Sequence, residues 1–477
     1  MNLVGGQLKA TLVRSRRRAT CLCGRSAVRR VLIANRGEIA LRAVRACRQL
    51  GLESVAVYST ADANSPHCWA ADHAVCIGPP APKASYLNAA ALIETAMASK
   101  CDAIYPGYGF LAENSSFAER CTESDLTFVG PSGECIARMG DKVTARQTAA
   151  AIGIPCVPGS KSGFTDVAAA EMASRNIGYP LLLKASGGGG GRGMRIVNDA
   201  ASFQAQFAQA SAEAQAAFGN PEIYLERFFS EVRHIEIQVF GDQHGNYVHL
   251  GERDCSVQRR HQKLVEEAPS PVLDQSTRRQ MAEAATTLIK ALKYVNAGTV
   301  EFIYEPASQK FFFIEMNTRI QVEHPVTEMV TGTELVVEQF RVAAGEKLSF
   351  GSTFANGRTA IEFRINAEDA AHGFRPSPGT LKRWRPPNGR DIRVDSHAYE
   401  NYAVPPYYDS MLAKLIVTGP DRASAIETAK SALARFQVAG LTTTVGFHAH
   451  LLQQPEFARA EIHTRWVEDN LQMAVPS

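Results

Sequence analysis

Short apolar runs and a helical repeat alternate near the start of the chain. Residues 31–34 are four consecutive apolar side chains, which is typical of a buried parallel strand. Residues 38–50 then place apolar side chains at helical spacing on one face, and Gly51 follows where a helix commonly ends. Residues 55–58 form another apolar run. The pattern predicts a strand, a helix and a second strand.

The same alternation continues with apolar runs at residues 103–105 and 127–129. Strands that alternate with helices predict a doubly wound α/β domain over residues 29–140. The turn after its first strand, at residues 35–38, reads Asn-Arg-Gly-Glu rather than GxGxxG. This sequence disfavours a dinucleotide-binding site, because that fingerprint requires three spaced glycines.

The rest of the chain predicts a second fold class. Two prolines and a glycine at residues 155–159 indicate a hinge, after which a small α/β unit is expected over residues 157–227. Alternating apolar positions then predict antiparallel strands in an α+β region over residues 228–475. The predicted strands are 235–240, 247–251, 299–304, 311–315 and 360–366, and a helix is predicted over 422–438.

Composition is that of an ordinary globular protein. The chain has 477 residues, of which 45% are hydrophobic and 21% charged, and this length suggests about three domains. No run of about 18 apolar residues is present, so a membrane span is not expected. Residues 1–30 carry eight basic side chains and no acid, so the total of +3 leaves −5 for the remainder. A mildly acidic body disfavours nucleic acid as a partner.

The basic leader, residues 1–28, has the arginine-rich, acid-free composition of a transit peptide and lacks the apolar stretch of a secretory signal. A disordered basic tail and an over-extended start of translation are the alternatives, and we favour the over-extended start. The ten cysteines show no CxxC pair or regular spacing. They indicate a reducing compartment rather than a disulfide framework, and the isolated pair Cys21 and Cys23 disfavours a zinc site.

A glycine-rich segment is the strongest local signal. Lys184 ends a predicted strand, and five consecutive glycines, 187–191, precede Arg192. Glycines let backbone N–H groups approach phosphate oxygens, and Lys184 adds a positive charge. A flexible linker is the plainer interpretation, but the flanking cations favour a loop that closes over a nucleotide. The order GxxxxGK[ST] is absent, so this is not a P-loop.

Two predicted strands place oxygen ligands together. Alternation puts Glu315 and Asn317 on one face of a strand, and Glu301 lies on another strand within an apolar run. Carboxylate and amide oxygens suit Mg²⁺ that bridges nucleotide phosphates. The alternative is solvated strand faces, but carboxylates in apolar runs normally need a cation or another partner. A magnesium site is therefore predicted.

Charged residues next to this strand suggest an anion pocket. Arg319 offers a planar fork for a small oxyanion, and Glu323 is a candidate general base, although an Arg and a Glu four apart are often a surface pair. The basic run at 252–263 is bracketed by acids, which favours an anion pocket over a polyanion stripe. Cys255 within it is expected to be structural rather than a nucleophile.

These motifs together resemble the ATP-grasp superfamily and, within it, biotin carboxylase. The resemblance spans residues 29–475. Its matching stretches are 33–40, 105–114, 139–142, 184–194, 252–269, 315–328, 363–369 and 405–411. It implies an N-terminal doubly wound domain, a mobile glycine-loop lid at 157–227, and an ATP-grasp core with a C-terminal antiparallel-sheet domain.

The resemblance also implies roles for individual residues. The ATP-binding residues would be Lys142, Lys184, Gly189, Gly190, Gly191, Glu226, His234, Gln258 and His261. Magnesium, with manganese as an alternative, would be held by Glu301, Glu315 and Asn317. Bicarbonate would be bound by Arg319, Gln321, Val322 and Lys263, and biotin by Tyr108, Glu113 and Arg364. The catalytic residues would be Glu323, Arg364, Arg319 and Lys263, with Glu323 as the base and Arg364 stabilising the biotin enolate.

The implied reaction is ATP-dependent carboxylation of biotin through carboxyphosphate. The chain contains no Met-Lys-Met sequence, so biotin is expected in trans on a biotin carboxyl carrier protein. Carboxyltransferase subunits and a second copy of the chain, as a homodimer, are the other expected partners. Acetyl-CoA carboxylase in the cytoplasm is the expected setting, and a two-subunit pyruvate or other acyl-CoA carboxylase is the alternative. Organelle import is expected only if the leader is a real transit peptide.

Three other functions are less well supported. Another ATP-grasp ligase is disfavoured by the motifs around Arg319, Glu323 and Arg364. A degenerate regulatory protein would be expected to lack a metal carboxylate or the bicarbonate arginine, and both are present. A nucleic-acid role for residues 9–30 would show as salt-dependent binding that is lost when they are removed.

Overall fold

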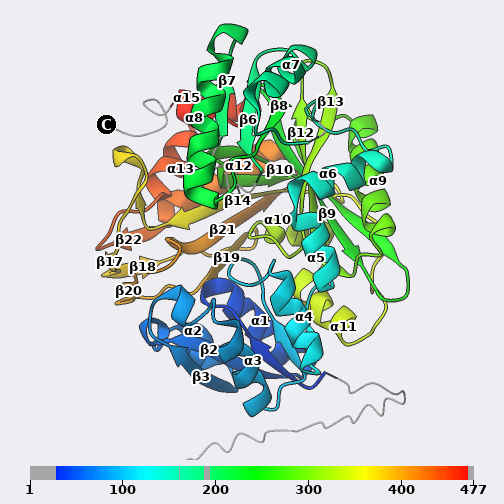
Figure 1. The fold of residues 1–477 in the computed structure, drawn as a ribbon. Coiled ribbons are helices and arrows are strands. Elements are labelled where there is room, and N and C mark those ends of the chain that lie inside the picture. Colours follow the sequence, from blue (N-terminus) through cyan, green and yellow to red (C-terminus); the bar gives the residue numbers. More distant parts are fainter. Residues whose placement is uncertain (1–27, 161, 187–193, 471–477) are drawn as a thin grey trace, which may run out of the picture.

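The structure is a computed structural model that describes residues 28–160, 162–186 and 194–470. The basic leader and the predicted phosphate loop, including Gly189, Gly190 and Gly191, lie outside the described residues. In Figure 1 a parallel sheet lies at one end of the molecule and a small antiparallel unit at the other, with a large antiparallel sheet between them.

The N-terminal region is a five-stranded parallel sheet of order β3-β2-β1-β4-β5, which confirms the doubly wound fold. Its strands are β1 Arg30–Ile33, β2 Glu53–Ser59, β3 His73–Gly78, β4 Ala103–Tyr105 and β5 Thr127–Phe128. The strand order reverses between β1 and β4, and such a switch point is where open α/β sheets bind ligands. Asn35, just after β1, donates hydrogen bonds to the carbonyls of Pro106 and Tyr108 after β4, each at 2.7 Å. This amide ties the two loops together at the sheet's carboxyl edge.

Helices cover both faces of this sheet. They are α1 Gly37–Leu50, α2 Pro66–Ala70, α3 Ala89–Ala98, α4 Ser115–Glu123 and α5 Gly133–Gly140, with short 3-10 turns η1 Thr60–Asp62 and η2 Pro82–Ala84. Strand β3 was not predicted from the sequence. It is an edge strand whose first residues are exposed, so it lacks the continuous apolar run that marks its buried neighbours.

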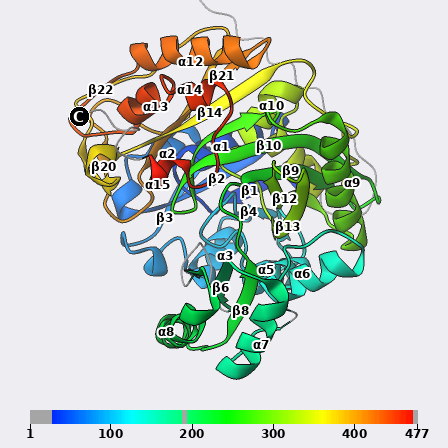
Figure 2. The same cartoon turned by 90° about the horizontal axis from the view of Figure 1, so that it is seen from above.

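The small unit is a three-stranded antiparallel sheet of order β7-β6-β8, and its strands are labelled in Figure 1. In Figure 2 its strands β6 and β8 lie at one end of the molecule. Its strands are β6 Leu181–Ala185, β7 Met194–Val197 and β8 Ile223–Arg227, and its helices are α7 Val167–Ile177 and α8 Ala200–Phe218. Phe203 and Phe207 of α8 pack on Leu181 and Leu183 of β6. Because side chains alternate along a strand, Lys184 lies on the opposite face of β6 and lines a cavity between the small unit and the central sheet.

The central sheet has eight strands in the order β13-β12-β9-β10-β11-β14-β21-β19, and every neighbouring pair is antiparallel. The strands are β9 Arg233–Gly241, β10 Tyr247–Arg259, β11 Gln262–Ala268, β12 Asn296–Glu305, β13 Lys310–Asn317, β14 Thr359–Asn366, β19 Ile392–Ser396 and β21 Met411–Gly419. Strand β10 is longer than predicted, so most of the basic run lies in the sheet. The associated helices are α6 Lys142–Ala151, α9 Gln275–Ala291, α10 His324–Thr331 and α11 Leu335–Ala343.

The C-terminal region adds helices and short strand pairs. The helices are α12 Arg422–Arg435, α13 Val445–Leu451, α14 Pro455–Ala458 and α15 Trp466–Asp469, with the 3-10 turn η3 Ala370–His372. The short strands are β15 Glu368–Asp369, β16 Arg375–Pro376, β17 Gly379–Thr380, β18 Arg383–Arg385, β20 Ala403–Val404 and β22 Gln437–Ala439. The helix predicted to reach residue 438 was wrong at its end, because Phe436 is extended and buried and β22 pairs with β18.

One face of the central sheet positions the site. Glu362 of β14 pairs with Ile416 of β21, and Arg364 pairs with Lys414. Alternation places all four side chains on the same face of the sheet. Helix α10 covers this face with two apolar side chains one turn apart, Val326 and Val330, which pack with Ala360 and Ile416. The N-terminal end of α10 therefore lies above the charged part of the face.

Among the described residues, no helix is both long and apolar enough to cross a membrane.

We expect the buried His67 to make the fold sensitive to acid. Its Nε2 lies 3.1 Å from the Val57 carbonyl, and burial lowers its pKa to about 4. An unfolded histidine protonates near pH 6.5, so the folded state loses stability as the pH falls from 6.5 to 4. The loss amounts to about 3 kcal/mol from this residue alone. Thermal unfolding of His67→Gln between pH 7 and pH 4.5 should show a shallower pH dependence than the parent, whereas the exposed His372→Gln should match it. An unchanged slope in His67→Gln would contradict the assignment.

Candidate active site

A cavity of about 1060 Å³ lies where the three regions meet. Its walls come from the loops after β1 and β4, from β6 and β7 of the small unit, and from the central sheet. Most of the predicted site residues line it: Tyr108, Lys142, Lys184, Glu226, His234, Gln258, His261, Lys263, Glu301, Glu315, Asn317, Arg319, Gln321, Val322 and Arg364. These residues, which were predicted from separate parts of the sequence, therefore lie around one cavity.

The predicted metal residues come from two paired strands. Glu301 of β12 and Glu315 of β13 are cross-strand partners, and a bulge follows Glu301 in this pairing. Glu301 is buried, but the Glu315 side chain is 36% exposed, so the apolar run around Glu315 does not bury its carboxylate. Its strand lies at the sheet edge, where one side opens to the cavity.

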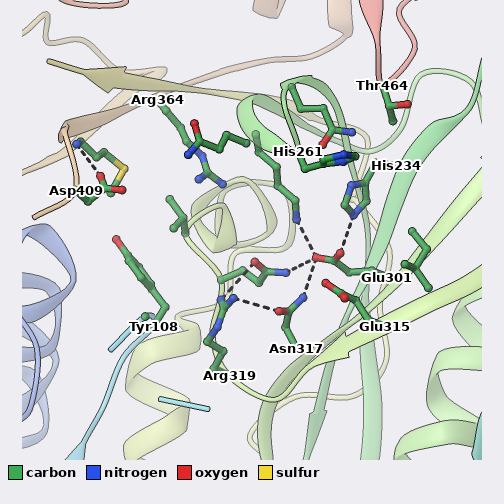
Figure 3. Close-up of a pocket in the computed structure, with 18 of the residues that line it drawn as sticks. Tyr108, His234, His261, Glu301, Glu315, Asn317, Arg319, Arg364, Asp409 and Thr464 are labelled. Atoms are coloured by element: carbon green, nitrogen blue, oxygen red, sulfur yellow. Dashed lines mark hydrogen bonds and ion pairs between the residues drawn. The ribbon is translucent and has the colours of Figure 1, made fainter. Parts of the chain in front are cut away.

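The buried carboxylate Glu301 is the centre of a hydrogen-bond network (Figure 3). Four side chains contact it: Lys263 Nζ at 3.0 Å, His234 Nε2 at 2.9 Å, Asn317 Nδ2 at 2.8 Å and Gln321 Nε2 at 2.8 Å. Burial alone would raise the pKa of Glu301, but the charges of Lys263 and His234 hold it well below the usual range. Glu301 is therefore an anion that can organise several donors at once.

Lys263 is shared by three buried carboxylates. Its Nζ lies 2.6 Å from Glu236, 3.0 Å from Glu301 and 2.7 Å from Glu323. Burial would lower the pKa of Lys263, yet these acids raise it well above its ordinary value, so it stays a cation. A cation with this many partners can move toward an added anion without leaving its neighbours unpaired.

Glu323 lies behind the cavity wall and is fully buried. It precedes α10, and its two oxygens contact Lys263 at 2.7 Å and Arg364 Nη2 at 2.8 Å. Burial favours the neutral acid, but Lys263 and Arg364 outweigh it and lower the pKa of Glu323 far below its usual range. Arg364 also donates from Nε to Glu266 at 2.7 Å, and burial raises the pKa of Glu266 to about 7.

Arg319 forms its ion pair with Glu113 rather than with Glu323. The alternative that Arg319 and Glu323 are a surface ion pair four residues apart is therefore wrong. The Nε of Arg319 donates to Glu113 at 2.8 Å and its Nη2 to Asn317 Oδ1 at 3.1 Å (the Asn317 contact is drawn in Figure 3). Glu113 also accepts from the Thr318 backbone N–H at 3.1 Å and is not among the residues that line the cavity. Glu113 thus holds Arg319 from behind.

The end of the cavity next to the small unit contains both charged and apolar side chains. Lys142 lies 3.7 Å from Glu315, while Glu226 contacts Lys184 and lies 3.3 Å from Arg146. His261 and Gln258 belong to the β10–β11 hairpin. Apolar residues from the small unit and the central sheet complete this end: Leu182, Met194, Ile196, Phe228, Ile303 and Ile314. Such a slot with a carboxylate at its edge suits a planar base joined to a charged tail.

Several contributing residues were missed in the sequence. Glu236 is in register with Glu301, and Arg253 with Glu236, so Glu315, Glu301, Glu236 and Arg253 form a row across four strands. Arg253 is fully buried and contacts Glu236, and burial raises the pKa of Glu236. The sequence contains a pattern that could have identified Glu236. Glu236 and Gln238 alternate with Ile235, Ile237 and Val239 in one predicted strand, which places both polar side chains on one face. Cys255, by contrast, is buried 4.0 Å from Glu323 with its pKa raised well above normal, which agrees with a structural thiol.

The predicted metal ligands fit a magnesium ion at the Glu315 end of this row of side chains. Glu301, Glu315 and the Asn317 oxygen are hard ligands on neighbouring strands of the same cavity. Two other clusters among the described residues, His234 with Glu236 and Glu301, and Glu236 with Cys255 and Glu323, each contain two carboxylates that contact Lys263. The predicted magnesium set shares only Glu301 with that lysine. Glu315 lines the cavity and has no contact with Lys263 among the described interactions, so its charge is better available to a divalent cation.

Comparisons with known proteins agree with this geometry. Three family descriptions match consecutive parts of the chain: "Biotin carboxylase, N-terminal domain" at residues 27–136, "Carbamoyl-phosphate synthase L chain, ATP binding domain" at 141–350, and "Biotin carboxylase C-terminal domain" at 362–469. A biotin carboxylase of Nostoc sp. is 51% identical over 443 residues, which cover 92% of this chain and 98% of that protein. A pyruvate carboxylase subunit from Methanothermobacter thermautotrophicus is 47% identical, covering 92% and 89%.

Solved structures show the same likeness. The biotin carboxylase domain dimer of Hydrogenobacter thermophilus 2-oxoglutarate carboxylase, in complex with MgADP, ADP and bicarbonate, has a TM-score of 0.90 and 43% identity, covering 95% of this chain and all of that one. A biotin carboxylase complex from Campylobacter jejuni has a TM-score of 0.89 and 44% identity, covering 93% and 99%. Family matches over most of the chain, close relatives and one shared architecture lead to one assignment. The chain belongs to the biotin carboxylase family of ATP-dependent ligases.

Proposed function

We propose that this enzyme uses ATP and bicarbonate to carboxylate biotin on a separate carrier protein, as the first half-reaction of acetyl-CoA carboxylase. The observation that carries the proposal is the contact of buried Glu323 with Lys263 and Arg364, which both line the cavity that also contains Lys142 and Lys184. In this proposal Glu323 is the base for bicarbonate and Arg364, which contacts it, is the cation for the biotin oxygen.

ATP is proposed to occupy the end of the cavity nearest the small unit. Lys142 and Lys184 bind its phosphates, His234, Gln258 and His261 line the path of its ribose and phosphates, and Glu226 lies at the adenine–ribose edge. The glycine loop, with Gly189, Gly190 and Gly191, is proposed to cover the phosphates. When Mg²⁺, or Mn²⁺ in its place, is bound by Glu301, Glu315 and Asn317, it neutralises phosphate charge during phosphoryl transfer.

Bicarbonate is proposed to bind between Arg319, Gln321, Val322 and Lys263. Glu323 accepts the bicarbonate proton while the bicarbonate oxygen attacks the γ-phosphorus, which gives carboxyphosphate and ADP. The low pKa of Glu323 keeps it ionised and ready to accept a proton. As Lys263 turns toward the bound anion, its charge is shared, and the pKa of Glu323 rises toward the range of an effective base.

Biotin is proposed to enter beside Tyr108, near the loops of the N-terminal sheet. Carboxyphosphate decomposes to CO₂ and phosphate, the phosphate removes the N1′ proton of biotin, and the resulting enolate attacks CO₂. Arg364 stabilises the negative ureido oxygen with its planar fork. Glu113 is proposed to act near biotin only indirectly, through its ion pair with Arg319.

The proposed partners are a biotin carboxyl carrier protein, carboxyltransferase subunits and a second copy of the chain. Relatives named for other acceptors, 2-oxoglutarate carboxylase and pyruvate carboxylase, make a two-subunit carboxylase for pyruvate or another acyl-CoA the alternative. The eight cysteines that the structure describes are all unpaired, which supports a reducing, cytoplasmic setting.

We expect purified enzyme to release ADP only slowly from ATP and Mg²⁺, and the rate to rise when bicarbonate and biotin are both added. Label from ¹⁴C-bicarbonate should appear on an intact biotinylated carrier. Acetyl-CoA, pyruvate or another acyl-CoA, tested with the co-purifying transferase, identifies the final acceptor. ADP release that ignores bicarbonate and biotin, with an unlabelled carrier, would contradict the proposed function.

A further inference from the structure

A second buried lysine lies next to the site without lining the cavity. Lys414, in the middle of β21, has a fully buried side chain. It is the cross-strand partner of Arg364 on one side and of Asp395 on the other. The three side chains therefore form a row on the face that α10 covers. A lysine is almost never buried to this degree unless specific groups hold its charge.

The contacts of Lys414 connect three distant parts of the chain. Its Nζ lies 3.1 Å from Glu38 Oε1 in the first turn of α1, and it donates to the Val322 carbonyl at 3.0 Å. The same Glu38 oxygen accepts a hydrogen bond from the Tyr108 hydroxyl. One buried cation thus joins the sheet strand beside Arg364, the loop before Glu323 and the tyrosine at the N-terminal wall of the cavity.

The loop that Lys414 contacts is held at two consecutive carbonyls. The Val322 carbonyl accepts from Lys414, and the Gln321 carbonyl lies 2.7 Å from His324 Nδ1. His324 is buried, and burial together with the nearby Lys414 charge lowers its pKa well below normal, so its ring is neutral and donates from Nδ1. With both carbonyls fixed, the peptide planes that present Gln321 and Val322 to the cavity have one orientation.

We propose that Lys414 is a positioning residue for bicarbonate: it sets the loop at residues 321–323 relative to Tyr108 and Arg364, so that the bicarbonate and biotin parts of the cavity keep a fixed separation. The proposal rests on the proposed function for the identity of the two ligands. Its geometric content, that Lys414 orders this loop through the Val322 carbonyl, does not.

The physical consequence is selective. ATP phosphates are proposed to contact Lys142 and Lys184, which lie on α6 and β6 and have no contact with Lys414 among the described interactions. A loop that shifts by about 1 Å costs a reaction up to about 100-fold when it misplaces a reacting group. Loss of Lys414 should therefore weaken the use of bicarbonate more than the binding of ATP.

The test compares the parent with the double variant Lys414→Met/Glu38→Gln, which removes both buried charges together, and with Glu38→Gln alone. The exposed Lys430→Met on α12 is the matched control. We expect the KM for bicarbonate in ADP release to rise by about 10-fold or more in the double variant, with the KM for ATP changed by less than about 3-fold. Glu38→Gln should shift the bicarbonate KM in the same direction by less. Equal changes in both KM values, or no change in either, would overturn the proposal.

Hydrogen exchange measured by mass spectrometry gives a readout that does not need activity. Peptides covering residues 319–326 should exchange faster in the double variant, while peptides from β1 and β2 should match the parent. If the double variant does not fold, the same measurement on Glu38→Gln decides the question, and unchanged exchange at 319–326 rejects the role of Lys414. A parent that lacks bicarbonate-dependent ADP release would contradict the proposed function, whereas the exchange result tests Lys414 independently.

Discussion

Replacing Glu323 with glutamine should reduce bicarbonate-dependent ADP release by about 100-fold or more, the range expected when a general base is lost. Glutamine keeps the size of the side chain and an oxygen that accepts from Lys263, but it cannot take a proton. The fold should tolerate the change, because Lys263 retains Glu236 and Glu301 and Arg364 retains Glu266. ATP binding, measured by equilibrium titration, should stay within about 3-fold of the parent, since Glu323 does not line the cavity.

The exposed Glu346→Gln is the matched control, because it makes the same chemical change outside the cavity. It should release ADP at the parental rate. If Glu323→Gln kept more than about a third of the bicarbonate-dependent rate, proton transfer to Glu323 would not be a step of the reaction. If it lost ATP binding as well, the carboxylate would be structural.

Local alternation was enough to predict part of this site. Glu315 and Asn317 lie two residues apart on one strand, and both line the cavity. The pairing of Glu315 with Glu301 also follows from a simple antiparallel hairpin, because β12 and β13 are adjacent in the chain. The doubly wound N-terminal sheet was predictable for the same reason, since every parallel strand except the edge strand β3 is a short apolar run next to a helical repeat.

The rest of the site depends on contacts between distant segments. Glu236 joins the carboxylate row only because β12 pairs with β9, and no local pattern specifies that register. In the sequence Lys414 is a single charged residue within an apolar strand, which does not indicate what it contacts. Its partners Glu38 and Val322 come from two other regions of the chain. Family resemblance identified Lys263 and Arg364, but not the buried acids Glu236 and Glu266 that hold them. Alternation marks Glu236 as a polar position of its strand, but the contacts of Glu236 with Lys263 and of Glu266 with Arg364 follow only from the pairing of the strands.

The charge arrangement explains why these acids are needed. Arg253 is a fully buried cation, the side chains of Lys263 and Arg364 are largely buried, and an isolated buried charge costs several kcal/mol. Glu236 and Glu266 offset that cost while no anion is bound, and they also fix where the cations point. A cation that is already in place, as Arg364 is through Glu266, stabilises negative charge that develops during the reaction without reorganising at that moment. This arrangement suits the bicarbonate, phosphate and biotin enolate that the proposed function requires the cavity to bind in turn.

Replacing Arg364 with lysine should separate the two stages of the reaction. Lysine keeps a positive charge between Glu266 and Glu323, so the buried acids stay neutralised, but it lacks the planar fork that can bind Glu323 and the biotin oxygen together. We expect transfer of ¹⁴C from bicarbonate to biotin to fall by about 100-fold or more, as when an oxyanion donor is removed. Bicarbonate-dependent ADP release should fall by less than about 10-fold, because Lys263 still contacts Glu323.

Arg358→Lys, at a partly exposed position just before the same strand, is the matched control for this change. It should leave ADP release and label transfer at parental levels. The ratio of biotin carboxylated to ADP released is the decisive quantity, because it does not depend on how much active enzyme each preparation contains. A ratio in Arg364→Lys that equals the parental ratio would mean that Arg364 acts only through Glu323, and that the biotin enolate is stabilised by another group.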